Sequence, residues 1–335
     1  MKLFCALLCT RFINRPLLMK VIDHIQQAKN TLISFEILPP LKGKSINSIF
    51  DHLDPLIEFN PSFINVTYHR SEQVFKKRAD GSFEKVEVRK RPGTVAICAA
   101  IMNHYKVDTV PHLICGGFSK RETEDALIDL NFLGIDNVLV LRGDAHKNES
   151  TFEPEPDGHP YAIELMRQVV NLNHGIYLEE DIREGSRTHF CIGVAGYPEK
   201  HFEAPNLQTD MSFLKAKVES GADYIVTQMF FDNKKYFSFV QECRDAGINV
   251  PIIPGLKPIT NKKQLSVIPR TFHVDIPTEL SVEIMKCKTD ADVEKVGTEW
   301  LVAQSKELKQ EGVPVLHYYT LGKPKVIRNV MLQVL

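Results

Sequence analysis

Short apolar segments recur along the chain at intervals that predict alternating strands and helices. Eight of them are rich in Val, Ile, Phe and Tyr and have the length of a β-strand. They cover residues 31–38, 63–68, 109–115, 137–144, 190–197, 224–231, 251–258 and 315–322. Between them, apolar residues return at helical spacing, as Ile163, Met166 and Val170 do. This alternation predicts an α/β fold with parallel strands, and the count of eight favours a closed (β/α)8 TIM barrel over an open doubly wound sheet.

Local signals mark the start of one predicted helix with particular clarity. Ser119 and Glu122 have the spacing of a capping box, in which each side chain satisfies a backbone N–H of the first turn. The helix that follows is expected to bury Leu127, Leu130, Phe132 and Leu133.

The chain carries no obvious internal boundary. No proline-rich or glycine-rich linker divides it, so we expect residues 19–335 to form one domain. Residues 1–18 contain an apolar run of only six residues, which Arg11 and Arg15 follow closely. Such a run is too short to span a membrane and is poor for export. We therefore expect a disordered leader, or a natural start at Met19.

Two segments interrupt the alternation of strands and helices. Residues 70–91 hold eight Lys or Arg and four Asp or Glu, and Asp80-Gly81 lies between two strand-like runs. This pattern predicts a β-hairpin inserted after the second strand. A solvated hairpin is favoured over a basic patch for a polyanion, because both signs of charge are present. Residues 146–159 follow the fourth strand, where a long loop is typical of a lid.

Composition and charge exclude several classes of protein. Hydrophobic residues make up 43% of the chain and charged residues 25%, which is typical of a soluble globular protein. The net charge of −1 provides no overall field that would favour nucleic acid or a membrane surface. The seven cysteines are scattered and form no CxxC pair, which argues against a zinc site or a disulfide framework. We predict a cytoplasmic protein without a bound metal.

Polar residues at the ends of the predicted strands are the candidates for chemistry, because barrel active sites gather there. In the first strand, Ser34 and Glu36 alternate with Phe35 and Ile37, so the two polar residues share the face toward the barrel interior. A carboxyl group among apolar neighbours keeps its proton more readily, as a general acid at neutral pH requires. The alternative is a carboxylate neutralised by a nearby Lys or Arg.

Other strands end in residues whose interpretation stays open. Gly143 permits close approach of a ligand to the backbone, and Asp144 follows it at the tip of the fourth strand. Gln228 needs partners for both ends of its amide, which a bound ring or a neighbour in the barrel would supply. A single inward histidine such as His112 is more often a satisfied core residue than a ligand. Tyr197 would stack on an aromatic ligand or simply pack.

The absence of familiar motifs narrows the choice further. The sequence has no GxGxxG, no GxxxxGK[ST], no HExxH and no GxSxG. It therefore lacks the signatures of a Rossmann nucleotide site, a P-loop, a zinc protease and a serine hydrolase. A bound dinucleotide would have to lie on barrel loops and helix N-termini.

Eight short motifs, taken in order, resemble those of the bacterial type of methylenetetrahydrofolate reductase. They are Ser-Phe-Glu-Ile-Leu-Pro-Pro from residue 34, Val-Thr-Tyr from 66, Pro-His-Leu-Ile-Cys from 111, Leu-Arg-Gly-Asp from 141, Gly-Tyr-Pro-Glu from 196, Thr-Gln-Met-Phe-Phe-Asp from 227, Ile-Pro-Gly-Leu-Lys-Pro from 253 and His-Tyr-Tyr-Thr-Leu from 317. The resemblance runs from about residue 20 to the C-terminus. It implies FAD bound without a Rossmann fold, and a ping-pong reaction in which NADH or NADPH reduces the flavin and the flavin reduces the folate.

The resemblance also implies roles for individual residues. Glu36 matches the acid that promotes opening of the folate ring to a 5-iminium cation, and Asp144 matches the residue that tunes the flavin and pterin by its charge. The family's FAD contacts match Thr67, His112, Arg142, Gly143, Asp144, Tyr197, His201, Asp210 and Lys217. The folate contacts match Gln228, Gln264 and Lys323. The product would supply methyl groups for methionine synthesis, and the protein is expected to be a homo-oligomer.

The sequence departs from the family at a few positions, and two alternative functions would each require a different feature. Ile268 stands where some relatives place a Phe against the nicotinamide, and Lys323 replaces an Arg, keeping its charge without the bidentate fork. A flavin barrel of the proline dehydrogenase type would need an arginine pair for a carboxylate, which is not evident. A non-catalytic folate-binding subunit of a larger complex would lack the flavin, and the colour of the protein would distinguish it.

Overall fold

The computed structural model describes residues 19–145, 151–183 and 185–335, and within them the predicted barrel is confirmed. The parallel strands are β1 (Leu32–Ile37), β2 (Phe63–Val66), β5 (Asp108–Ile114), β6 (Asn137–Leu141), β7 (Cys191–Gly196), β8 (Tyr224–Thr227), β9 (Ile252–Ile253), β10 (Gly255–Leu256) and β11 (Val315–Tyr319). Their order around the sheet is β10-β11-β1-β2-β5-β6-β7-β8-β9, and every neighbouring pair is parallel.

The seventh predicted strand differs from expectation because it is split in two. Pro254 lies between β9 and β10, and a proline has no N–H to donate to a sheet. The first half pairs with β8 and the second half with β11. Together, the two short strands therefore occupy the place in the barrel that the sequence predicted for a single strand over 251–258.

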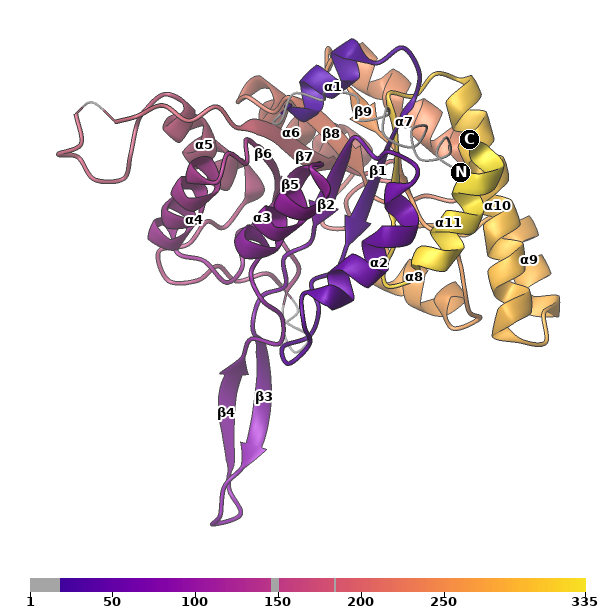
Figure 1. Cartoon of the computed structure of the whole chain (residues 1–335), viewed down its shortest axis with the longest axis horizontal. Helices are drawn as coiled ribbons and strands as arrows, with labels where there is room; N and C mark the ends of the chain where they lie inside the picture. The colour runs from indigo at the N-terminus through magenta and orange to yellow at the C-terminus, as the bar shows by residue number, and fades with distance from the viewer. Residues whose placement is uncertain (1–18, 146–150, 184) are drawn as a thin grey trace, which may run out of the picture.

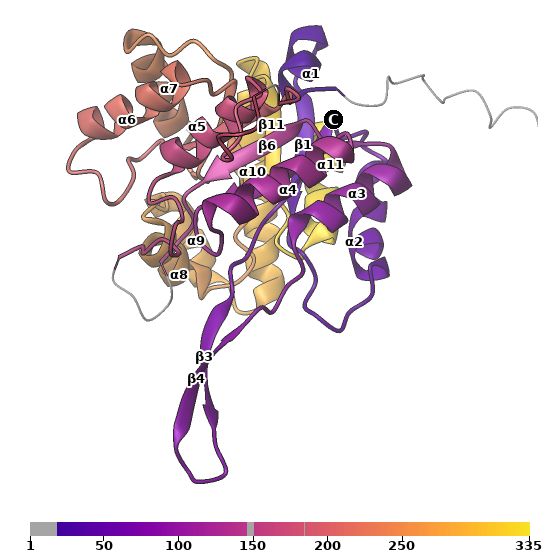
Figure 2. The same cartoon turned by 90° about the vertical axis from the view of Figure 1, so that its left-hand side faces the viewer.

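Helices surround the barrel and cover its outer face (Figures 1 and 2). They are α1 (Val21–Gln27), α2 (Asn47–Ile57), α3 (Thr94–Tyr105), α4 (Lys120–Phe132), α5 (Ala162–Asn173), α6 (Leu207–Glu219), α7 (Asn233–Asp245), α8 (Gln264–Phe272), α9 (Thr278–Lys286), α10 (Asp290–Gln310) and α11 (Pro324–Val334). The main core lies between strands and helices, where outward residues such as Phe35 and Ile37 pack. No helix in the described ranges is long and apolar enough to cross a membrane.

The start of α4 agrees with the sequence, but its buried face does not entirely. Ser119 and Glu122 form the predicted capping box, and Leu127 and Leu130 are buried. Phe132 is 82% exposed and Leu133 is 43% exposed, so the predicted burial of these two residues was wrong. Five residues at 100° per residue turn Phe132 well away from the face of Leu127.

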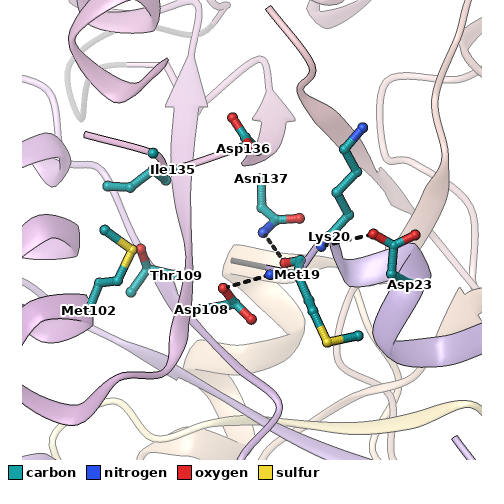
Figure 3. Close-up of a pocket in the computed structure, with 10 residues that line it drawn as sticks. Met19, Lys20, Asp23, Met102, Asp108, Thr109, Ile135, Asp136 and Asn137 are labelled. Atoms are coloured by element: carbon teal, nitrogen blue, oxygen red, sulfur yellow. Dashed lines mark hydrogen bonds between the residues drawn. The ribbon is translucent and has the colours of Figure 1, made fainter. Parts of the chain in front are cut away.

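The N-terminal end of the barrel is closed by α1, which lies across it. Val21 reaches an apolar interior layer that includes Phe63 and Tyr224. The Val21 amide donates to Asn137 Oδ1 at 2.8 Å, and Asn137 Nδ2 donates to the Met19 carbonyl at 3.0 Å. Figure 3 shows the contact between Asn137 and Met19 in a small pocket of about 100 Å³ at this end. The predicted leader at 1–18 lies outside the described residues.

The predicted hairpin insertion is also confirmed. It consists of β3 (Glu72–Lys77) and β4 (Phe83–Val88), which pair in antiparallel register. Gly81 has φ +87° in the turn, a conformation that glycine adopts without strain. The two strands form a sheet of their own and project away from the barrel (Figures 1 and 2).

Candidate active site

Glu36 lies inside the barrel near the C-terminal end of β1, as its alternation with Phe35 and Ile37 predicted. It is 7% exposed, and the strand register places it opposite Asn65 on β2 and Tyr319 on β11. Ser34, two residues earlier on the same face, lies opposite His317. The apolar interior layer therefore gives way to a group of polar side chains at the end where barrel active sites lie.

Two histidines face the Glu36 carboxylate. His112 Nε2 lies 3.4 Å from Glu36 Oε2 and 3.3 Å from the Asn65 amide nitrogen. Burial lowers the pKa of His112 to about 4, so this imidazole is neutral near pH 7. A neutral imidazole offers one donor and one acceptor. It therefore suits a carboxyl group in either protonation state and orients it without requiring it to be an anion.

The second histidine retains an unused hydrogen-bonding group. His317 Nδ1 pairs with Ser34 Oγ at 2.8 Å, while its Nε2 lies 3.8 Å from Glu36 Oε2. His317 Nε2 and Asn65 Oδ1 are both buried and have no hydrogen-bond partner in the described part of the chain. Buried polar atoms without partners cost free energy, so this pair has the chemistry of a ligand-binding wall.

Sequence reasoning missed both Asn65 and His317 as members of this group. The available signal was a polar residue at an inward position of an apolar strand. Asn65 lies two residues before Thr67, and His317 lies two residues before Tyr319. Their proximity to Glu36 depends on the strand register, which no single segment reveals.

The Arg-Gly-Asp segment is a loop after β6 rather than the tip of the strand, which corrects the predicted extent 137–144. Gly143 has φ +85°, and this conformation ends the strand at Leu141. Arg142 forms a bidentate ion pair with Glu203, with N–O distances of 2.5 and 2.7 Å, and the Glu203 carboxylate raises the pKa of Arg142. No local sequence pattern indicates Glu203 as its partner.

Asp144 is exposed beside this loop, within electrostatic reach of the Glu36 group. Burial lowers the pKa of His69, and the negative charges of Glu36 and Asp144 both oppose that effect. Thr67 Oγ1 lies 3.2 Å from His69 Nε2. The two predicted catalytic carboxylates therefore act on one histidine at the mouth of the barrel.

Four of the predicted cofactor contacts lie on the loop after β7 and on α6. The rings of Tyr197 and His201 meet edge to face at 4.7 Å, and the His201 amide donates to Asp210 Oδ2 at 2.9 Å. Lys217 Nζ donates to the Ala195 carbonyl at 2.8 Å. Burial lowers the pKa of Lys217 to about 8, an effect that Asp210 opposes.

The three predicted folate contacts are less closely connected. Gln228 follows β8, contrary to its predicted place within a strand, and its Oε1 accepts from the next amide, Met229, at 2.9 Å. Gln264 Oε1 accepts from the Thr260 amide at 2.6 Å, which is a local capping contact. Lys323 Nζ lies 3.7 Å from Glu294 Oε2, and its side chain is 54% exposed.

Two further observations concern Ile268 and possible metal ligands. Ile268 is 2% exposed and belongs to a separate apolar cluster, so the side chain is committed to packing. Within the described ranges, no group of three or more His, Cys, Asp or Glu side chains is placed to hold a metal ion.

The family model of methylenetetrahydrofolate reductase matches residues 20–334. The chain is 32% identical over 327 residues to methylenetetrahydrofolate reductase (NADH) 1 of Arabidopsis thaliana, covering 94% of this chain and 50% of that protein. It is 31% identical over 297 residues to 5,10-methylenetetrahydrofolate reductase of Salmonella typhimurium, covering 88% and 87%. The chain thus spans about half the length of its curated eukaryotic relatives and most of the length of this bacterial one.

Among solved structures, a Clostridium thermocellum protein that binds two copies of 5-methyl-5,6,7,8-tetrahydrofolic acid has a similar fold. The TM-score is 0.56 at 15% identity, and the match covers 93% of this chain and 97% of the other. At that identity the similarity establishes the shared architecture alone.

Proposed function

We propose that this chain, which belongs to the methylenetetrahydrofolate reductase family, reduces 5,10-methylenetetrahydrofolate to 5-methyltetrahydrofolate with electrons from NADH or NADPH. The observation that carries the proposal is the Glu36 carboxyl, buried at the barrel mouth between His112 and His317. Under this proposal the protein works in the cytoplasm as a homo-oligomer and supplies methyl groups for methionine synthesis.

The residues around this mouth fit FAD as a bound cofactor. Arg142 and Lys217 are cations suited to its phosphates, and Gly143 turns the loop after β6 with φ +85°. The other residues that would hold it are Thr67, His112, Asp144, Tyr197, His201 and Asp210. When bound, FAD supplies hydride transfer between the nicotinamide and the folate.

Glu36 would act as the general acid toward the folate. Its proton would pass to the ring nitrogen whose bond to the methylene carbon breaks, which leaves a 5-iminium cation to be reduced. His317, held by Ser34 at 2.8 Å, and neutral His112 would keep the carboxyl oriented toward the substrate. Asp144 would stabilise positive charge on the substrate, and Gln228, Gln264 and Lys323 would contact the folate.

The absorption spectrum of the purified protein tests this proposal directly. We expect a flavin spectrum with about one FAD per chain, bleached anaerobically by NADH or by NADPH and restored by methylenetetrahydrofolate. A protein that is colourless and takes up no added FAD would rule the proposal out. A flavin that either nicotinamide bleaches but the folate fails to reoxidise would point to a different electron acceptor.

A further inference from the structure

The β3–β4 hairpin, referred to below as the arm, extends from the barrel, and no third strand of the described ranges pairs with it (Figures 1 and 2). Its base is anchored, because the Lys42 amide donates to the Lys90 carbonyl at 2.8 Å and the Arg89 guanidinium lies 5.3 Å from the centre of the Tyr68 ring. A two-stranded hairpin alone is marginally stable in water. The arm therefore gains stability if another surface covers one of its faces.

The two faces of the arm differ in the size and the exposure of their apolar side chains. Phe75 pairs with Lys85, and Lys77 pairs with Phe83, so both rings and both lysines lie on one face. Phe75 is 62% exposed and Phe83 is 66% exposed. The opposite face carries the smaller Val74, which is half-buried. The larger apolar side chains are thus the exposed ones, which is typical of a contact surface.

The aromatic face of the arm carries an excess of basic side chains. Lys77 and Lys85 lie on this face with one acidic residue, Glu87, whereas residues 72–88 as a whole hold four basic and four acidic side chains. Arg78 pairs with Glu84 within the arm, but neither Lys77 nor Lys85 forms an ion pair with a described residue. The aromatic face therefore suits a partner surface that is apolar and acidic.

Such a surface occurs on the chain itself, in the loop at residues 176–182 between α5 and β7. Exposed apolar and acidic side chains are interleaved there: Ile176, Leu178, Glu180, Asp181 and Ile182. The loop is held against α4, since the Leu178 amide donates to Glu124 Oε2 at 2.9 Å and Arg121 pairs with Glu179. It projects beside α5 (Figure 1), away from the arm of the same chain.

We propose that the aromatic face of the arm docks on the 176–182 loop of a second copy of this chain. Phe75 and Phe83 would cover the exposed isoleucines, and Lys77 and Lys85 would meet Glu180 and Asp181. Two such contacts related by a two-fold axis close a dimer, because each copy offers one arm and one loop. The buried aromatic rings would supply the affinity, and the charges would set the pairing. This inference does not depend on the proposed enzymatic function.

Sedimentation velocity of three proteins provides the first test. The wild-type chain should associate, and Phe75→Ser with Phe83→Ser should weaken association by about tenfold or more. The matched control is Met285→Ser with Leu332→Ser, which removes two apolar side chains of similar exposure, 69% and 58%, from α9 and α11. The control should associate like the wild type. A monomeric wild type, or equal association of all three proteins, would overturn the proposal.

Charge reversal provides the second test and identifies the partner surface. Lys77→Glu with Lys85→Glu should weaken association, and so should Glu180→Lys with Asp181→Lys. A mixture of the two variants should associate again, because each acidic arm then meets a basic loop and each basic arm meets an acidic one. Unchanged thermal midpoints would exclude misfolding as the cause. If mixing restored nothing while single-stranded DNA or poly-glutamate bound the wild-type arm, the arm would be a polyanion site and the proposal would be wrong.

Discussion

Asn137 and Asn65 are buried asparagines at opposite ends of the barrel, with exposures of 3% and 0%. Asn137 uses both ends of its amide, accepting from the Val21 N–H and donating to the Met19 carbonyl. Asn65 has a partner for its nitrogen at 3.3 Å, whereas its oxygen has none in the described part of the chain. The first amide joins α1 to the barrel and contributes to stability, while the second keeps a hydrogen-bonding group available at the mouth.

This difference agrees with the general division of labour in TIM barrels, where the C-terminal ends of the strands carry the chemistry. In this chain the difference between the two ends extends to individual polar atoms. The His317 Nε2 and Asn65 Oδ1 atoms lie close to Glu36 and have no hydrogen-bond partner among the described residues, while His24 and Asp108 at the other end form a contact of 2.6 Å. Variants at the two ends should therefore separate function from stability.

The largest expected effect is on catalysis at the mouth. Glu36→Gln should lower folate reduction by about 10²- to 10⁴-fold, since glutamine cannot donate the proton that opens the ring. Flavin reduction by NADH or NADPH should be retained, because that step needs no acid. Stopped-flow measurement of each half-reaction checks this. Asp144→Asn is the contrasting variant and should slow both half-reactions modestly. Equal loss of both half-reactions in Glu36→Gln would contradict the assigned role.

The next effect is on stability in acid. The pKa of His112 is lowered to about 4 in the folded state, against 6.5 for an unburied imidazole. Between those values the unfolded chain binds a proton that the folded chain does not, so stability falls as pH drops from 6.5 to 4. One histidine accounts for about 3 kcal/mol of that loss. Urea unfolding across this range should show a shallower dependence in His112→Gln. An identical slope in both proteins would mean that His112 is protonated in the fold.

The separation in sequence between interacting residues decides which parts of the site could be predicted. Glu36 was placed inside the barrel because alternation along one strand is a local property, and the hairpin followed from Asp80-Gly81 between two strand-like runs. The Glu36 and His317 pair joins residues far apart in sequence through strand register, which no local pattern encodes. The split at Pro254 is different, since the proline was visible and its effect on pairing could have been anticipated.

A smaller effect is expected from the two asparagines themselves. Asn137→Ala should lower the free energy of unfolding by about 1–3 kcal/mol, because the buried Val21 N–H loses its acceptor. Turnover at saturating substrate should be unchanged. Asn65→Ala removes one 3.3 Å contact and leaves no backbone group without its partner. It should therefore lower the free energy of unfolding by about 1 kcal/mol or less. It should instead raise the KM for the folate. The comparison fails if Asn137→Ala impairs turnover more than Asn65→Ala does.

The smallest expected effect concerns residues 1–18. Met19 is held by its backbone, through its amide to Asp108 Oδ1 at 3.2 Å and its carbonyl to Asn137 Nδ2, and neither contact needs an earlier side chain. A chain shortened to begin at Met19 keeps these groups, and its new ammonium would face the Asp108 carboxylate. We therefore expect the same thermal midpoint and flavin content as for the full chain. A full chain with Asn137→Ala provides the scale, because it breaks the attachment of α1 directly. If the shortened chain were as unstable as that variant, or lost its flavin, residues 1–18 would have to be counted as part of the structure that closes the N-terminal end.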